Sequence, residues 1–157
     1  GTTIAHVGDP EAALLGPKLY EEFCHPVYVK IAKKWKEAET SGGKRHATLY
    51  HFCGNAAAIF ARIASTGVDM MDVDSLVPMK TAKELVGNVC LKGNLNPMMF
   101  MEADGKAMDE GVKAMVHDMG GRNFVIGTGC HIPGNTVPSK LRFYMDAAKK
   151  YGERKKR

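Results

Sequence analysis

Short apolar runs alternate with stretches of helical periodicity along the chain. The apolar runs are bounded by Gly, Pro, Asn or Asp and are typical of buried strands. We predict five strands, at residues 4–7, 47–52, 68–73, 88–91 and 123–127. After each run the spacing of apolar positions becomes helical, so each predicted strand is followed by a helix.

The predicted helices begin near residue 17, span 56–65, 78–86 and 98–119, and begin again at 138. In the first of them, apolar residues recur every four positions, at Leu19, Phe23, Val27, Ile31 and Trp35. This spacing is close enough to the helical period for them to form one face. Pro26 interrupts the run and predicts a kink or two helices, and residues 40–43 are expected to end it.

Regular alternation of strand and helix predicts an α/β fold, with a parallel sheet and helices packed against it. Five such units could form an open doubly wound sheet or part of a (β/α)8 barrel. A complete barrel usually needs about 250 residues, whereas this chain has 157. No linker or low-complexity segment divides the sequence, so we predict a single domain over residues 1–157.

Composition and charge narrow the classes of function. The chain is 45% hydrophobic and 25% charged, and no run approaches the roughly 18–20 apolar residues of a membrane span. The first ten residues lack the basic and apolar regions of a signal peptide, so we expect a cytoplasmic protein without a membrane partner. Much of the net charge of +5 lies in residues 149–157, where basic side chains suit a helix C-terminus. No basic patch interleaved with aromatics appears elsewhere, so nucleic acid is not expected as a partner.

Chemistry-bearing residues gather where predicted strands end, which is the edge at which parallel α/β folds place function. His51 and Cys53 end one strand, and residues i and i+2 of a strand point to the same face. Cys130 ends another strand, which a barrel could bring to the same edge. One nitrogen and two sulfurs suit zinc, and three protein ligands with an open position are the catalytic arrangement. The alternative is that His51 is an ordinary polar residue and the two cysteines are small core residues.

The wide, irregular spacing of the four cysteines is unlike a secreted disulfide scaffold. Cys24 lies in a predicted helix and Cys90 in a predicted strand. Both are expected to be ordinary core residues.

Further polar residues follow the same strand ends. Asp72 and Asp74 lie on one face, where either could supply a fourth ligand or orient a ligand imidazole; the competing interpretation of Asp74 is a helix N-cap. Asp9 is either a functional strand-end acid or a turn former, and Asn94 lies in a glycine–asparagine turn. His131, in the last strand-end loop, either lies beside the site or is a plain loop residue. We take Asp9 and Asp74 as candidate catalytic residues, and the other three as candidate substrate-binding residues.

Several of these segments, in this order, resemble a known superfamily. They are HFCGN at 51–55, GVDMMDVDS at 67–75, AKELVG at 82–87, GNLNP at 93–97 and GTGCHIP at 127–133. With the opening IAHVGDPEAALLGPKLYEEFCHP, they resemble the uroporphyrinogen decarboxylase superfamily over residues 4–151. Within it they are most similar to the corrinoid-dependent zinc methyltransferases of the methylcobamide:coenzyme M type.

The resemblance implies a (β/α)8 barrel in which zinc is held by His51, Cys53 and Cys130. Asp74 matches a carboxylate that serves in relatives as a further ligand and is displaced by the incoming thiol. The resemblance implies that this thiol, bound as thiolate, attacks the methyl group of a methylated corrinoid carried by a partner protein. Decarboxylases of the superfamily have a histidine where this chain has Cys130, which favours the methyltransferase branch.

The resemblance covers only the C-terminal half of the family, which contains all three expected ligands. A half barrel exposes strand edges and apolar surface, so we expect self-association or pairing with a complementary N-terminal half. Three functions stay open at this point: a zinc-dependent methyltransferase once the barrel is completed, a tetrapyrrole decarboxylase that needs no metal, and a non-catalytic partner of a corrinoid protein.

Overall fold

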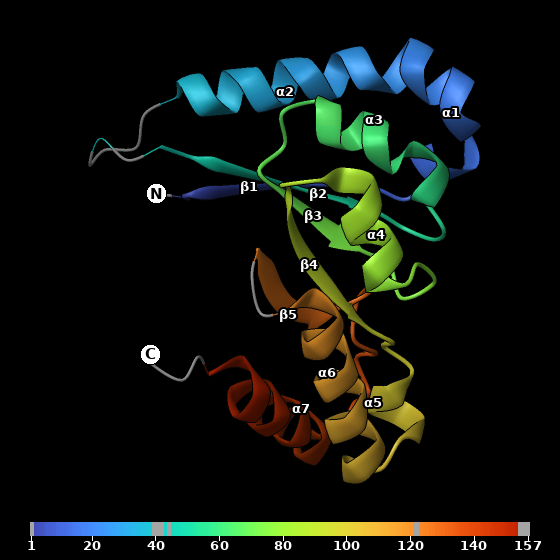
Figure 1. Ribbon diagram of the computed structural model, residues 1–157, viewed down its shortest axis with the longest axis vertical. Helices are drawn as coiled ribbons and strands as arrows, with labels where there is room; N and C mark the ends of the chain where they lie inside the picture. The colour runs from blue at the N-terminus through green and yellow to red at the C-terminus, as the bar shows by residue number, and fades with distance from the viewer. Residues whose placement is uncertain (1, 39–42, 44, 121–122, 154–157) are drawn as a thin grey trace.

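Five parallel strands form one sheet in the order in which they follow along the chain (Figure 1). The computed structural model describes residues 2–38, 43, 45–120 and 123–153. The strands are β1 (Ile4–Asp9), β2 (Ala47–Phe52), β3 (Met70–Val73), β4 (Cys90–Leu95) and β5 (Phe124–Thr128). All neighbouring pairs are parallel, so the carboxyl ends of the strands lie at one edge of the sheet.

Helical segments follow every strand and confirm the predicted alternation. Between β1 and β2 the chain forms η1 (Ala12–Leu14), α1 (Gly16–Leu19), the π-helical segment η2 (Tyr20–Cys24) and α2 (His25–Glu37). The later segments are η3 (Ala57–Ile59), α3 (Phe60–Ser65), α4 (Met79–Val86), α5 (Met99–Glu102), α6 (Gly105–Met119) and α7 (Pro138–Gly152). Among the described residues, no helix is long and apolar enough to cross a membrane.

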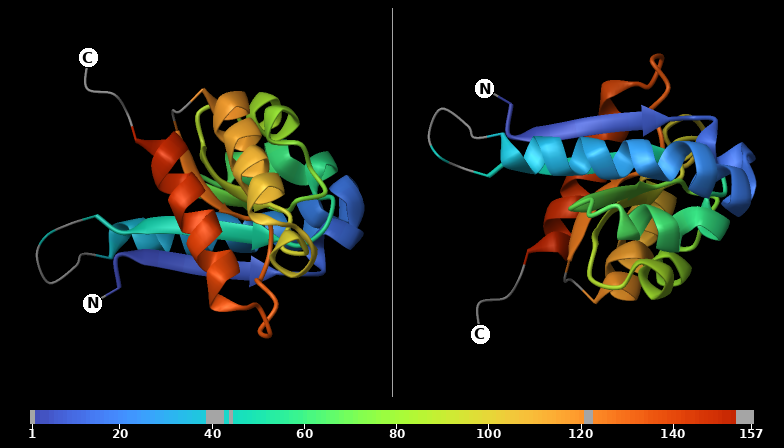
Figure 2. Two further views of the ribbon diagram at one scale, coloured as in Figure 1. Left: turned by 90° about the horizontal axis from the view of Figure 1, so that it is seen from below. Right: turned by 90° about the horizontal axis from the view of Figure 1, so that it is seen from above.

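Helices cover one face of the sheet, and the residues of that face form the core. Tyr50 and Phe52 of β2 are buried there, and the Tyr50 hydroxyl donates to the carbonyl of Tyr28 in α2 at 2.8 Å. Helices α2, α3, α4 and α6 contact one another in turn, and Figure 2 shows them on the same side of the strands. Because side chains alternate along a strand, His51 points to the opposite face, which carries the candidate site.

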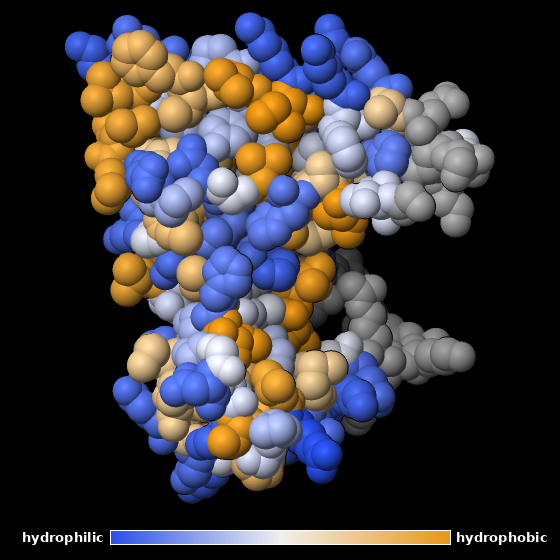
Figure 3. Space-filling view, turned by 180° about the vertical axis from the view of Figure 1, so that it is seen from behind, coloured by the Kyte–Doolittle hydropathy of each residue, from blue (hydrophilic) through white to orange (hydrophobic). Residues whose placement is uncertain are grey.

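The four-residue apolar spacing in the first helical region marks an exposed face rather than the core face. Leu19, Phe23 and Val27 are 43%, 63% and 52% exposed, and the two further members of the run are half-buried. The buried face carries Tyr20 and Tyr28 instead, because their rings pack against the aromatic residues of β2. Hydrophobic side chains therefore gather on the surface at the α1 end of the molecule (Figure 3).

Pro26 coincides with a change of helix type. It lies in the first turn of α2, directly after the π-helical segment η2, and the backbone stays in the αR region through Cys24 and His25. The chain therefore continues as one helical stretch here, and not as two helices separated by a break. The predicted boundary at 40–43 lies outside the described residues except for Gly43, and so do residues 154–157 of the basic tail.

The predicted helix 98–119 is wrong as a single helix. Ala103 is extended, with φ −74° and ψ 148°, and separates α5 from α6. The Asp104 carboxylate then accepts a hydrogen bond from the N–H of Ala107 at 2.8 Å. An aspartate satisfies free N–H groups best at a helix start, so Asp104 begins a new helix.

The predicted end of the fourth strand is also wrong, because β4 continues through the expected turn to Leu95. Gly93 has φ +130°, and a Cβ there would lie 2.7 Å from the carbonyl oxygen of Val73 in β3. The glycine is thus required by a close approach of two strands, and it does not mark a turn.

Candidate metal centre

The three side chains predicted as zinc ligands meet at the carboxyl edge of the sheet. His51 lies near the end of β2, Cys53 follows that strand, and Cys130 lies two residues after β5. Their ligand atoms all lie within 4.8 Å of one another, and His51 Nε2 is 3.2 Å from Cys53 Sγ. His51 is buried and both cysteines are half-buried. The chain therefore brings one imidazole and two thiols to one point, while their role as ligands stays a prediction.

Gly129 allows the loop after β5 to reach this point. A Cβ at Gly129 would lie 2.3 Å from the backbone nitrogen of Ser75, in the loop between β3 and α4. The Gly129 N–H donates to the carbonyl of Leu95 at 2.9 Å, and the Thr128 hydroxyl donates to the carbonyl of Cys130 at 2.8 Å. Close contact between the two loops therefore holds Cys130 toward Cys53.

Asp74, in the loop after β3, binds the backbone on both sides of the candidate site. Its Oδ2 accepts from the N–H of Gly54 at 2.9 Å, and its Oδ1 accepts from the N–H of Leu76 at 2.9 Å. Asp74 is buried and lies outside the group of clustered ligand atoms. In this structure its carboxylate connects the turn after Cys53 to the loop after β3. Its predicted role as a further ligand remains a prediction.

Asp72 lies between His51 and Lys92, a residue that the analysis of the sequence missed. Asp72 Oδ2 is 2.5 Å from Lys92 Nζ and 3.6 Å from His51 Nδ1. Lys92 follows directly after the predicted end of the fourth strand. Because side chains alternate between the two faces of a strand, a longer strand would have placed Lys92 on the same face as Asn94. The two ring nitrogens of His51 thus face different partners, since Nε2 points to Cys53 and Nδ1 to the carboxylate.

The electrostatic surroundings of Cys53 favour its neutral thiol. Burial raises the pKa of Cys53, and the neighbouring Cys130 and the carboxylates of Asp74 and Asp72 raise it further. A bound cation acts in the opposite sense, because it stabilises the thiolate. A metal ion bound by these sulfurs would therefore offset the effects that raise the pKa of Cys53.

A cavity of about 300 Å³ opens beside the three side chains. It is lined by His6, His51, Asp72, Lys92, Thr128, Cys130, His131 and Ile132. His131 is exposed and lines the cavity without joining the cluster of ligand atoms. A small molecule that enters here would meet His51 and Cys130, two of the three predicted metal ligands.

Asn94 and Asp9 have clear structural contacts away from this cavity. Asn94 Nδ2 donates to the carbonyls of Asp74 at 3.2 Å and Val77 at 2.7 Å, which fixes the loop after β3. Asp9 accepts two backbone N–H groups after β1 and the Tyr28 hydroxyl at 2.6 Å. Asp9 thus matches the turn-former interpretation, and neither residue lines the cavity.

The two remaining cysteines are free and half-buried. Cys24 packs against the hydrophobic core, as expected, whereas Cys90 lies at the start of β4 on the face opposite the helices. Burial raises the pKa of both thiols.

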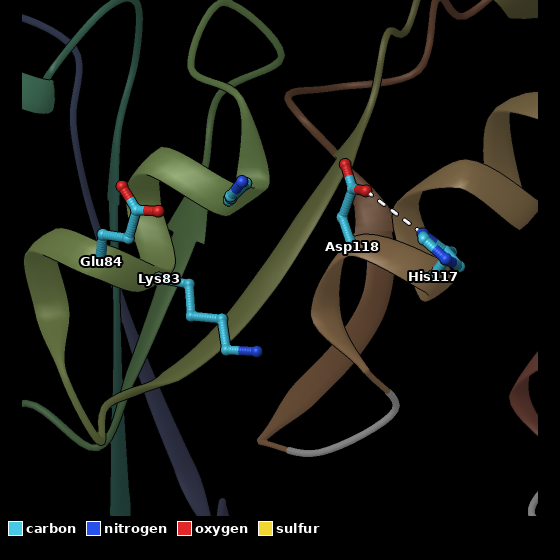
Figure 4. Close-up of a pocket in the computed structure, with 5 residues that line it drawn as sticks. Lys83, Glu84, His117 and Asp118 are labelled. Carbon is cyan, nitrogen blue, oxygen red and sulfur yellow. Dashed lines mark ion pairs between the residues drawn. The ribbon is translucent and has the colours of Figure 1, made fainter.

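A larger cavity, of about 510 Å³, lies between α4 and α6, away from the strand ends. Figure 4 shows Lys83 and Glu84 on one side and His117 and Asp118 on the other. His117 Nδ1 is 3.6 Å from Asp118, and Lys83 donates to the carbonyl of Met119 at 3.3 Å. His117 and Asp118 thus pair within α6, and Lys83 reaches a backbone carbonyl across the groove, so these contacts define no catalytic group.

Known proteins share both the sequence and the fold of this chain. It is 31% identical over 160 residues to the methylcobamide:CoM methyltransferase MtbA of Methanosarcina acetivorans, covering 95% of this chain and 42% of the relative. It is 32% identical over 151 residues to the same enzyme of Methanosarcina mazei, covering 95% and 42%. Human uroporphyrinogen decarboxylase is 26% identical over 152 residues, covering 96% and 41%. The chain thus spans about 42% of the length of the relatives that it matches first.

A solved methyltransferase from Methanosarcina mazei superposes with a TM-score of 0.81 at 22% identity, covering 98% of this chain and 43% of that one. This match confirms the predicted fold class, an α/β fold that forms part of a TIM barrel. The family model described as uroporphyrinogen decarboxylase (URO-D) matches residues 1–151. The chain therefore belongs to the uroporphyrinogen decarboxylase family.

Proposed function

We propose that this chain is part of a zinc-dependent methyltransferase that moves a methyl group from a methylated corrinoid to a thiol held at the zinc. The observation that carries the proposal is the convergence of His51, Cys53 and Cys130 within 4.8 Å. The two methylcobamide:CoM methyltransferases among the relatives support it, because their name states this type of transfer.

The residues present fit a zinc ion. Zinc is bound by imidazole and thiolate ligands, and three protein ligands leave a fourth position for a ligand from outside. In the described part of the chain, His51 Nδ1 and Asp72 Oδ1 are buried without a hydrogen-bond partner. In metal sites a ligand imidazole commonly donates its second ring N–H to a carboxylate, which orients the ring. The pairing of His51 with Asp72 matches this arrangement.

Zinc at this point would supply the charge that favours the thiolate form of an acceptor at neutral pH. The chain's own residues position that acceptor. His51 offers Nε2 toward the two sulfurs, Asp72 faces its other ring nitrogen, and the adjacent cavity admits a small molecule. We therefore propose a small thiol such as coenzyme M as the acceptor and a corrinoid protein as the partner.

The two predicted thiol ligands also indicate in which cellular compartment the protein works. Two cysteines that bind a metal must stay reduced, and disulfides are rare where thioredoxin and glutathione act. The four cysteines are free. We propose the cytoplasm as the location of this protein.

A decarboxylase acting on a tetrapyrrole is the second candidate, because further relatives are uroporphyrinogen decarboxylases. The resemblance implies no metal for that reaction, so stoichiometric zinc distinguishes the two. Zinc that is bound but never supports methyl transfer would favour the third candidate, a non-catalytic partner of a corrinoid protein.

Metal analysis of the purified chain tests the proposal. We expect about one zinc per chain, lost in both Cys53→Ser and Cys130→Ser, because each substitution removes one sulfur ligand. Cys24→Ser is the matched control and should keep its zinc. In the presence of the rest of the barrel, methylcobalamin should methylate coenzyme M only with the zinc-loaded chain. A wild-type chain without zinc, or serine variants that retain it, would overturn the proposal.

A further inference from the structure

We infer that Lys92 is a positioning residue of the metal centre, which acts through Asp72 on the ligand imidazole of His51. This inference rests on the proposed function, because it assumes that His51 binds the metal. It adds a residue that neither the motifs nor the cluster of ligand atoms includes.

The sheet register places the three residues in one row. His51 of β2 is paired with Asp72 of β3, and Asp72 is paired with Lys92 of β4. Paired residues of neighbouring parallel strands point to the same face, so their side chains lie next to one another above the face opposite the helices. The row is rigid because three hydrogen-bonded strands define it.

The distances show how the row is connected. Lys92 Nζ lies 2.5 Å from Asp72 Oδ2, and the same oxygen lies 3.6 Å from His51 Nδ1. The side chain of Asp72 is only 7% exposed, and that of Lys92 is 28% exposed. A buried carboxylate needs a charged partner, because water no longer stabilises its charge. Lys92 is the ammonium group that provides this stabilisation.

Gly127 of β5 holds Lys92 from the other side. A Cβ at Gly127 would lie 3.0 Å from Lys92 Cγ and 3.3 Å from its Cε, so the aliphatic part of Lys92 passes directly over this glycine. The lysine stem is therefore seated between Asp72 and the backbone of β5, which limits the positions that its ammonium group can reach.

The consequence for the metal centre follows from the two ring nitrogens. With Nδ1 directed to the fixed Asp72 carboxylate, His51 presents Nε2 to Cys53 at 3.2 Å. Carboxylates that orient a ligand histidine typically contribute about 10- to 100-fold to metal affinity. Because Lys92 fixes Asp72, part of this contribution to metal affinity depends on a lysine that does not itself contact the metal.

Zinc affinity, measured by competition with a chromogenic chelator, tests the inference. We expect Asp72→Asn and Lys92→Met each to weaken zinc binding by about 10-fold or more, and Lys92→Arg to restore most of the affinity. The double variant should bind no more weakly than Asp72→Asn alone, because both changes interrupt the same connection. Lys150→Met, which removes the exposed pair with Asp109, is the control and should leave the affinity unchanged.

A spectroscopic readout separates positioning from simple stability. In the Co²⁺-loaded chain the ligand-field bands should shift in Lys92→Met and return in Lys92→Arg. If Lys92→Met does not fold, Lys92→Gln takes its place, because it keeps a polar side chain but removes the positive charge that stabilises the Asp72 carboxylate. We expect the same weaker zinc binding.

The outcomes distinguish the two proposals. A wild-type chain that binds no zinc overturns the proposed function and this inference with it. Zinc bound as tightly by Lys92→Met as by the wild type, or losses that multiply in the double variant, overturn this inference alone.

Discussion

Three carboxylates lie at strand ends, and their surroundings give them two different roles. Asp74 accepts backbone N–H groups on both oxygens, and Asp9 accepts backbone N–H groups and a tyrosine hydroxyl. Asp72 instead keeps one buried oxygen without a partner among the described residues. Asp9 and Asp74 therefore hold backbone segments, whereas Asp72 remains the acid that can act on a neighbouring side chain.

Tyr28→Phe tests the structural role of Asp9. The substitution removes the hydroxyl that donates to Asp9 at 2.6 Å, and hydrogen bonds to charged groups contribute about 1.5–3 kcal/mol. We expect the free energy of unfolding, from urea titration, to fall by about 1–3 kcal/mol with unchanged zinc content. Tyr50→Phe is the control, because its hydroxyl donates to a neutral carbonyl and should contribute less. A Tyr28→Phe chain that loses its zinc would show that Asp9 serves the metal centre instead.

At the scale of elements, the sequence predicted each strand and most helices, because apolar runs and helical spacing are local signals. It failed where a single residue redirects the backbone. Asp104 looks like any polar position within a helix, yet its capping bond to Ala107 starts α6. Gly93 looks like a turn, yet its close approach to Val73 keeps it in β4. Both depend on contacts in space that spacing cannot reveal.

The convergence of the three predicted ligands could be foreseen from the sequence, and so could Asp72 beside them, but Lys92 could not. His51 and Cys53 share a face by the two-residue period of a strand, and Cys130 follows another strand end. Lys92 was missed because its significance comes from strand pairing, which places it beside Asp72. The order of strands in a sheet is a property of the fold and does not appear in any single segment.

The loop after β5 is the element on which the site depends most. Gly129→Ala would place a methyl group against the backbone of Ser75, and such overpacking costs about 1–3 kcal/mol. The loop must move away and take Cys130 with it, so we expect zinc affinity to fall by about 10-fold or more. Chelator competition and thermal unfolding measure the two effects.

Gly134→Ala in the same loop is the matched control for this prediction, because a Cβ there meets nothing within 4 Å. It should leave both stability and zinc affinity near those of the wild type. Equal affinity in the two alanine variants would mean that the contact between the loops does not position Cys130.

At the scale of the whole molecule, the sheet is covered by helices on one face only, and β1 and β5 each pair with a single strand in the described part of the chain. Ile4 of β1 and Val125 of β5 are 44% and 41% exposed. The relatives are more than twice as long as the segment that matches. Exposed apolar edge strands can pair with strands of another chain. We therefore expect the edges of this sheet to promote association.

We therefore expect the isolated chain to self-associate, or to bind a complementary part of the barrel when one is present. Sedimentation velocity over a range of concentrations should show a mass that rises with concentration. Ile4→Lys should reduce this rise, because a charged side chain on an edge strand opposes pairing. Met145→Lys on α7, which removes a 51% exposed apolar side chain away from the strands, should have little effect. A monomer that stays stable at every concentration would mean that the exposed edges are tolerated without a partner.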